Sequence, residues 1–70
     1  MEKKMEIIGR IEAQMDYLHI AKDMIALNAT YHAGMGMIDL CKDMHLITVD
    51  ESIALDQRMY KTWYECKQMI

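Results

Sequence analysis

Apolar residues recur every three or four positions along most of the chain, the spacing that puts side chains on one face of an α-helix. The 70 residues include no proline and only three glycines, so little interrupts this pattern. β-branched residues do not alternate with polar ones, and no strand is predicted. The pattern predicts an all-α fold with one domain, residues 1–70. Its three helices span roughly residues 2–27, 30–45 and 49–69, with the long N-terminal helix packed on an antiparallel helical hairpin.

The first predicted helix is apolar on two nearly opposite sides. One seam consists of Ile8, Ile11, Met15, Leu18 and Ile25, and the other of Ala13, Tyr17, Ile20, Met24, Leu27 and Tyr31. A helix with two apolar sides needs two neighbours. Both neighbours could belong to a plain three-helix bundle, or one seam could meet a second copy of the chain. We favour the second copy, because a chain this short is at the lower limit of what one core can stabilise.

The end of this first helix can be placed at two points. Asn28 and Thr30 are residue types that start helices, whereas Gly34 and Gly36 are of the type that ends them. We place the break near Asn28 to Thr30, because one continuous apolar helical face follows it, made of Ala33, Met37, Leu40, Cys41 and Met44. Gly34 and Gly36 then lie early in the second helix and allow its backbone to approach a neighbour closely.

The joint between the second and third helices carries the clearest local signal. Thr48 and Glu51 have the spacing of a capping box, and Asp50 adds negative charge at a helix N-terminus. A hairpin folded here puts Cys41 and Cys66 at heights that differ by roughly 16 Å, at about 1.5 Å per residue. This difference exceeds the ~7 Å Cα separation that a disulfide allows, so two free, buried thiols are predicted.

The charge pattern limits the classes of partner. The net charge is −3, and acidic and basic residues are interspersed. This balance argues against binding to nucleic acid or to an anionic membrane surface. Asp50 and Glu51 would also repel phosphate at the place where a DNA-binding helix-turn-helix offers cations. No segment has the roughly 18 apolar residues of a membrane span, and the charged N-terminus is unlike a signal peptide, so we expect a cytoplasmic protein.

Few side chains have the spacing of a chemical site. Asp16 and His19 lie three apart on one helix, and Cys41 and His45 lie four apart, which are spacings found in metal sites. Each pair comes from a single helix, however, and no second pair completes it. No nucleophile–base–acid set is visible, and so short a chain leaves little room to enclose a pocket. We therefore expect no metal, no cofactor and no enzyme activity.

The candidates for a protein interface come from the second seam of the first helix and from the aromatic and apolar residues of the third helix that lie beside its core stripe. They are Tyr17, Ile20, Met24, Leu27, Tyr31, Ile53, Tyr60, Trp63 and Tyr64. We expect a non-catalytic protein-interaction module, a small inhibitor or adaptor that acts as a homodimer or higher oligomer by occupying the surface of an unidentified protein partner. The nine methionines fit this function, since flexible thioethers adapt to partner grooves. One alternative is a ligand- or metal-sequestering helical bundle with its site between protomers. Another is a DNA-binding helix-turn-helix protein, against which the charges at the start of the third helix argue.

Overall fold

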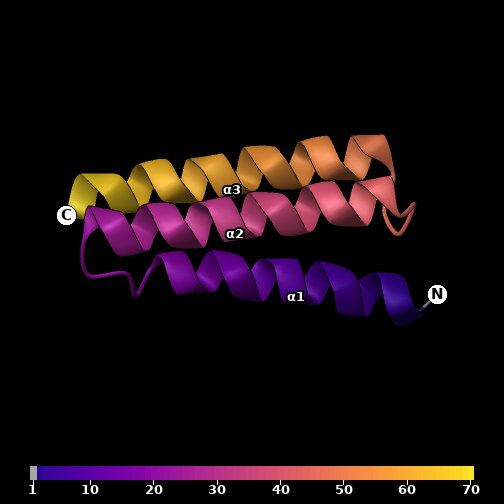
Figure 1. Cartoon of the computed structure of the whole chain (residues 1–70), viewed down its shortest axis with the longest axis horizontal. Helices are drawn as coiled ribbons and strands as arrows, with labels where there is room; N and C mark the ends of the chain where they lie inside the picture. Colours follow the sequence, from indigo (N-terminus) through magenta and orange to yellow (C-terminus); the bar gives the residue numbers. More distant parts are fainter. Residues whose placement is uncertain (1) are drawn as a thin grey trace.

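Three helices, each antiparallel to the one before it, make up the structure, a computed structural model that describes residues 2–70. They are α1 (Glu2–Leu18), α2 (Met24–Asp43) and α3 (Val49–Met69). Figure 1 shows them side by side, with α2 between α1 and α3 in this view. The molecule measures 37 × 18 × 15 Å along its principal axes. The all-α prediction is confirmed, since α1 packs on the α2–α3 hairpin and the described residues contain no strand.

The first break in the chain lies earlier than the sequence predicted. α1 ends at Leu18 after 17 residues, so the predicted helix over 2–27 is too long, and α1 is the shortest of the three helices. α2 runs without interruption past both predicted breaks, near Asn28 and near Gly34. The second apolar seam predicted for the first helix is therefore divided between α1, the turn after it, and α2.

Asp23 explains the position of the break. Its carboxylate accepts a hydrogen bond from the Ala26 N–H at 2.8 Å, which satisfies one of the free N–H groups at the start of α2. The reversal also lets Leu18 and Leu27 enter the same core, where each is almost fully buried. On one continuous helix, at about 100° per residue, these two side chains would point to opposite sides. Burial of both leucines therefore requires the chain to turn between them.

The second joint forms as predicted. The Thr48 N–H donates to Glu51 Oε1 at 2.8 Å, and the Glu51 N–H donates to Thr48 Oγ1 at 3.1 Å, which completes the capping box. Lys4 of α1 lies 3.0 Å from the same Glu51 carboxylate. The hydrogen bond from the Thr48 N–H, followed by the Lys4 ammonium, holds the pKa of Glu51 below its ordinary value. The start of α3 is thus tied to α1 by an ion pair.

α2 ends in a Schellman motif, in which His45 takes the position that glycine commonly occupies. The Leu46 N–H donates to the Cys41 carbonyl at 2.9 Å, and the His45 N–H donates to the Lys42 carbonyl at 3.0 Å. His45 has a φ of 59°, in the left-handed region where a β-carbon crowds the backbone. The turn is therefore built at some cost in backbone strain.

Replacing His45 by Gly is expected to stabilise the fold by roughly 1 kcal/mol, because glycine adopts the left-handed conformation without strain. His32 provides the matched control, since it is an exposed histidine within α2. There the same change is expected to destabilise by roughly 1 kcal/mol, the ordinary cost of glycine inside a helix. Urea unfolding followed by circular dichroism measures both. Destabilisation by His45→Gly would show that the imidazole contributes more than the strain costs.

The core lies along the line where the three helices meet. Its buried residues are Ile11, Met15, Leu18, Leu27, Ile38, Ile47, Leu55, Met59 and Cys66. Gly34 allows a close approach, as predicted, because a β-carbon there would lie 2.5 Å from Met59 Cε. Gly36 does not have the predicted close neighbour, because it lies on an outer side of α2 with no atom within 4 Å of such a β-carbon. The Met59 thioether of α3 fills the space beside Gly34.

Candidate protein interface

Four aromatic rings form a continuous ladder between α2 and α3. The ring centroids are 5.3 Å apart for Tyr31 and Trp63, 5.7 Å for Trp63 and Tyr60, and 6.4 Å for Tyr60 and Tyr64. These separations are those of interacting aromatic pairs. Ile53 lies two turns before Tyr60 on the same side of α3. We call these five residues the aromatic face; all five are among the interface candidates predicted from the sequence.

Trp63 is fixed at the centre of the aromatic face. Its Nε1 donates a hydrogen bond to Asn28 Oδ1 at 2.9 Å, and Lys67 Nζ lies 5.1 Å from the ring centroid. Asn28 was predicted to start a helix, and instead it binds the indole from within α2. The ring is therefore held in place by the fold itself, which lowers the entropy that a binding partner would have to remove.

The aromatic face is open to solvent on its outer side. Tyr60 is 53% exposed, and Ile53 and Tyr64 are each 49% exposed. Arg58 pairs with Glu12 of α1 at 3.2 Å, and it lies about 160° around α3 from Tyr60. α1 therefore packs on the other side of α3 and leaves the aromatic face uncovered.

A carboxylate lies beside the aromatic face. Oδ1 of Asp56 is buried and accepts no hydrogen bond from the described residues. Burial raises the pKa of Asp56, and the charge of Asp39 raises it further. Burial, followed by the charge of Asp56, raises the pKa of Tyr31. Asp56 lies two turns before Trp63 on the same side of α3, which puts its carboxylate beside the ladder.

Replacing Asp56 by Asn is expected to stabilise the chain near neutral pH. An acid whose pKa is raised by folding binds its proton more tightly in the native state, so its contribution to stability is present at low pH and lost as pH rises. The difference between Asp56→Asn and the unchanged chain should therefore grow from about pH 4 to pH 7. Urea unfolding across that range measures it. A difference that stays constant with pH would contradict the buried position of this carboxylate.

The remaining four residues of the predicted interface differ in how far the structure buries them. Tyr17 and Ile20 are exposed, on α1 and in the turn after it. Met24 is partly buried against the core. Leu27 is fully buried in the core and is removed from the candidate set. The sequence could not separate these residues, because it placed all four on one side of a single long helix.

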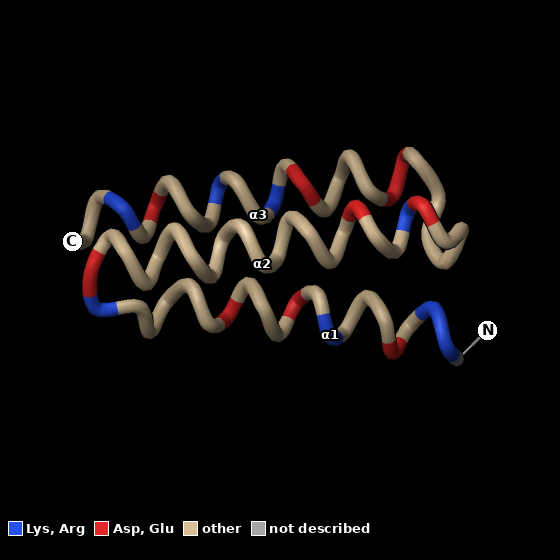
Figure 2. The backbone as a smooth tube through the Cα atoms, viewed as in Figure 1, with Lys and Arg blue, Asp and Glu red and all other residues tan. Residues whose placement is uncertain are grey.

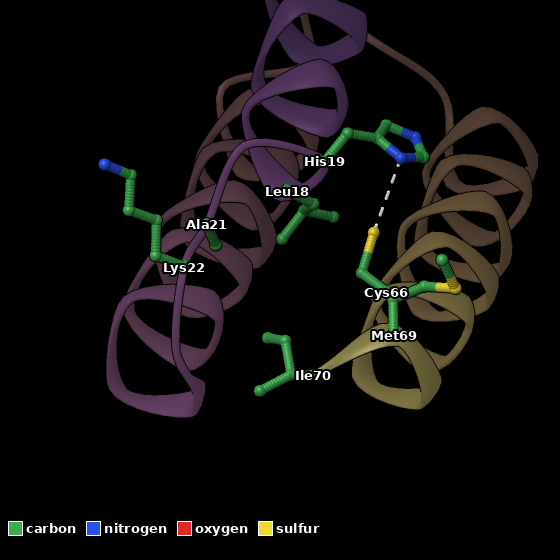
Figure 3. A pocket seen from close by; sticks show the side chains of 7 residues that line it. All are labelled: Leu18, His19, Ala21, Lys22, Cys66, Met69 and Ile70. Atoms are coloured by element: carbon green, nitrogen blue, oxygen red, sulfur yellow. Dashed lines mark hydrogen bonds between the residues drawn. The ribbon is translucent and has the colours of Figure 1, made fainter.

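A cavity of about 410 Å³ lies between the turn after α1 and the C-terminal end of α3 (Figure 3). Its lining residues are Leu18, His19, Ala21, Lys22, Cys66, Met69 and Ile70. Cys66 Sγ lies 3.5 Å from His19 Nδ1. Burial, followed by the charge of Glu65, raises the pKa of the Cys66 thiol, which favours a neutral thiol bonded to the imidazole. Cys41 and Cys66 are both free, as predicted, but only Cys66 is buried, and Cys41 is partly exposed.

The sequence did not indicate the pairing of His19 with Cys66. The two residues are 47 positions apart, and the sequence placed His19 beside Asp16 on one continuous helix. Within residues 2–70, no group of three or more His, Cys, Asp or Glu side chains is arranged to hold a metal ion. None of the helices described is long and apolar enough to cross a membrane. Comparisons of the chain with protein families, curated proteins and solved structures give no match.

Proposed function

We propose that the chain is a non-catalytic protein-interaction module, an inhibitor or adaptor that occupies the surface of a protein partner with its aromatic face. The observation that carries the proposal is the aromatic ladder, whose outer members Tyr60 and Tyr64 are about half exposed. Tyrosine and tryptophan are the residues that most often dominate binding energy in protein interfaces. A row of four aromatic rings on a surface that α1 leaves open has this composition.

Contacts with α2 hold the rings of the aromatic face in fixed positions. Trp63 is anchored to α2 by Asn28, and Tyr31 packs against the Trp63 ring from α2. Rigid rings supply a large contact area with few side-chain torsions to immobilise. The exposed part of the ladder therefore presents a preformed surface, and binding would require little rearrangement of this chain.

The charges around the aromatic face indicate the chemistry of the partner. Asp56 has an unpaired, buried carboxylate oxygen, and Asp39 lies near enough to raise its pKa. Lys42 offsets part of this negative charge, since it lowers the pKa of Asp56, and an arginine or lysine of the partner beside the two carboxylates would offset the rest. The proposed partner surface is therefore apolar, to cover Tyr60 and Tyr64, with a basic side chain at its edge.

Site-specific photo-crosslinking tests the proposal in the cells that make the chain. A photoreactive phenylalanine analogue is placed at Tyr60 or at Tyr64, one position at a time. Lys61 and Glu65 provide matched controls, because they are exposed on the same helix but lie on another side of it. One discrete adduct with a second protein is expected from positions 60 and 64, several-fold stronger than from 61 and 65. Equal yields from all four positions, or none from 60 and 64, would refute the proposal.

Sequestration of a ligand is the second candidate function, and the cavity beside His19 and Cys66 is the observation that favours it. Thiol and imidazole groups are ligands for soft and intermediate metal ions, and a site between protomers would take its further ligands from a second copy of the chain. Metal analysis of the purified chain separates the two functions. Metal at a stoichiometric level that is lost in Cys66→Ser would favour sequestration, whereas a metal-free chain that crosslinks through Tyr60 would favour interaction.

A further inference from the structure

We propose that two copies of the chain associate through an outer side of α2, with the two α2 helices antiparallel. This contact uses a surface separate from the aromatic face, because Ala33 lies about 160° around α2 from Tyr31. The α2–α2 contact gives the second copy of the chain one defined surface. Its test does not depend on the proposed function.

α2 differs from the other two helices in its lack of charge. No charged residue occurs between Asp23 and Asp39. Figure 2 shows charged residues spread along α1 and α3, whereas α2 carries them only towards its C-terminal end. A helix with a solvent-facing side usually carries charged residues there. Most of the exposed side of α2 is instead apolar or small.

The exposed side of α2 forms a ridge of residues at helical spacing, which we call the α2 ridge. It consists of Ile25, Ala29, Ala33, Gly36 and Leu40. Ile25 is 84% exposed and Leu40 59% exposed, and the three small residues between them are also exposed. Small residues at the centre allow a second helix to come close, and the large residues at the two ends then pack beside it.

The pattern of the α2 ridge is self-complementary. Its centre lies midway between residues 32 and 33, and an antiparallel copy placed about that point brings Ile25 opposite Leu40 of the second copy. The same register brings Ala29 opposite Gly36 of the second copy. Large residues meet at both ends and small residues meet in the middle, which is the arrangement that a twofold-symmetric contact requires.

The charges at the two ends of α2 fit the same register. Lys22 precedes the helix and Asp43 ends it, and both are exposed. They lie equally far from the centre of the α2 ridge, so each Lys22 comes level with Asp43 of the second copy. The antiparallel arrangement also puts the positive end of each helix dipole beside the negative end of the other. A parallel arrangement in the same register would bring like charges together.

A hollow beside Leu40 can receive Ile25, the N-terminal end of the α2 ridge of the second copy. It has a volume of about 230 Å³ and is lined by Ile7, Arg10, Met37, Leu40 and Cys41. In the antiparallel register Ile25 of the second copy lies opposite Leu40, at the mouth of this hollow. Ile25 is the most exposed apolar side chain of α2. The twofold symmetry would bury it in both copies, each time beside Leu40 of the other copy.

Sedimentation equilibrium of the full chain tests this proposal, with a mass of two copies of the 8.2 kDa chain expected. Ala33→Glu puts like charges beside the symmetry axis and is expected to weaken association on the order of a hundredfold. Circular dichroism checks that this variant keeps its helices, since Ala33 is exposed. A single-copy mass at all concentrations, or a dimer that Ala33→Glu leaves unchanged, would overturn the proposal.

A charge swap tests the register. Lys22→Asp is expected to weaken association on the order of tenfold, and Lys22→Asp combined with Asp43→Lys is expected to restore it. Both substitutions suit the dipole of α2, so a loss of association cannot be assigned to a weaker helix. Tyr60→Ser with Tyr64→Ser serves as the control and should leave the dimer intact. A dimer that this control dissociates would place the contact on the aromatic face instead, and failure of the swap would exclude the register.

Discussion

Replacing Met59 by Ala is expected to lower the free energy of unfolding by about 2–5 kcal/mol. The Met59 side chain is fully buried, and its thioether fills the space that Gly34 leaves on α2. Truncation removes apolar contacts from the core and leaves a cavity between α2 and α3. A chain of 70 residues has on the order of 5 kcal/mol of stability in total. At the upper end of the expected loss, about half of this variant would be unfolded without denaturant.

Met69 provides the matched control for this prediction. It is a methionine of the same helix, and it is 87% exposed. Met69→Ala is expected to change the free energy of unfolding by no more than about 0.5 kcal/mol. Urea unfolding of both variants at one protein concentration measures the difference. Similar losses for the two would contradict the assignment of Met59 to the core.

Replacing Gly34 by Val is expected to destabilise the fold by roughly 1–3 kcal/mol, although valine is the better helix former. A β-carbon at this position would lie 2.5 Å from Met59 Cε and 3.2 Å from Gln14 Cγ. Side chains of both α1 and α3 must then move, and the buried Met59 has little free space to enter. Gly9→Val is the matched control, because no atom lies within 4 Å of a β-carbon there. Equal effects of the two substitutions would contradict the close packing at Gly34.

Met59→Ala and Gly34→Val are expected to compensate for each other when they are combined in one variant. Truncation of Met59 makes room for the side chain introduced at Gly34, so the double variant should lose less stability than the two single variants together. A difference of more than about 0.5 kcal/mol from additivity measures this coupling. An additive result would mean that Gly34 and Met59 do not share one space.

The features that the sequence predicted correctly depend on short-range chemistry. Thr48 and Glu51 are three residues apart, and each satisfies the backbone of the other whatever the rest of the chain does. The three-helix architecture follows from the apolar period and from the absence of proline. The close approach at Gly34 was also predictable, since glycine inside a helix costs stability unless something packs against it.

The features that the sequence missed depend on the position of the first break. Asn28 and Asp23 are both good N-cap residues, and only the burial of Leu27 in the core selects Asp23. The misplaced break hid the α2 ridge, because it divided residues 24–38 between two predicted helices. It also hid the cavity, because His19 reaches Cys66 only when α1 ends beside the C-terminal end of α3. Contacts between distant residues cannot be inferred from spacing along one helix.

The most direct test of the aromatic face as a protein interface uses the untagged chain in a fresh extract of the cells that make it. The quantity measured is the mass of the complex in which the chain elutes. Size-exclusion chromatography compares the unchanged chain with the variant that carries Tyr60→Ser and Tyr64→Ser. The unchanged chain is expected to elute in a complex larger than two copies of 8.2 kDa, and the variant at no more than two copies. Elution of both at the mass of one or two copies would contradict a role for the aromatic face in binding a protein partner.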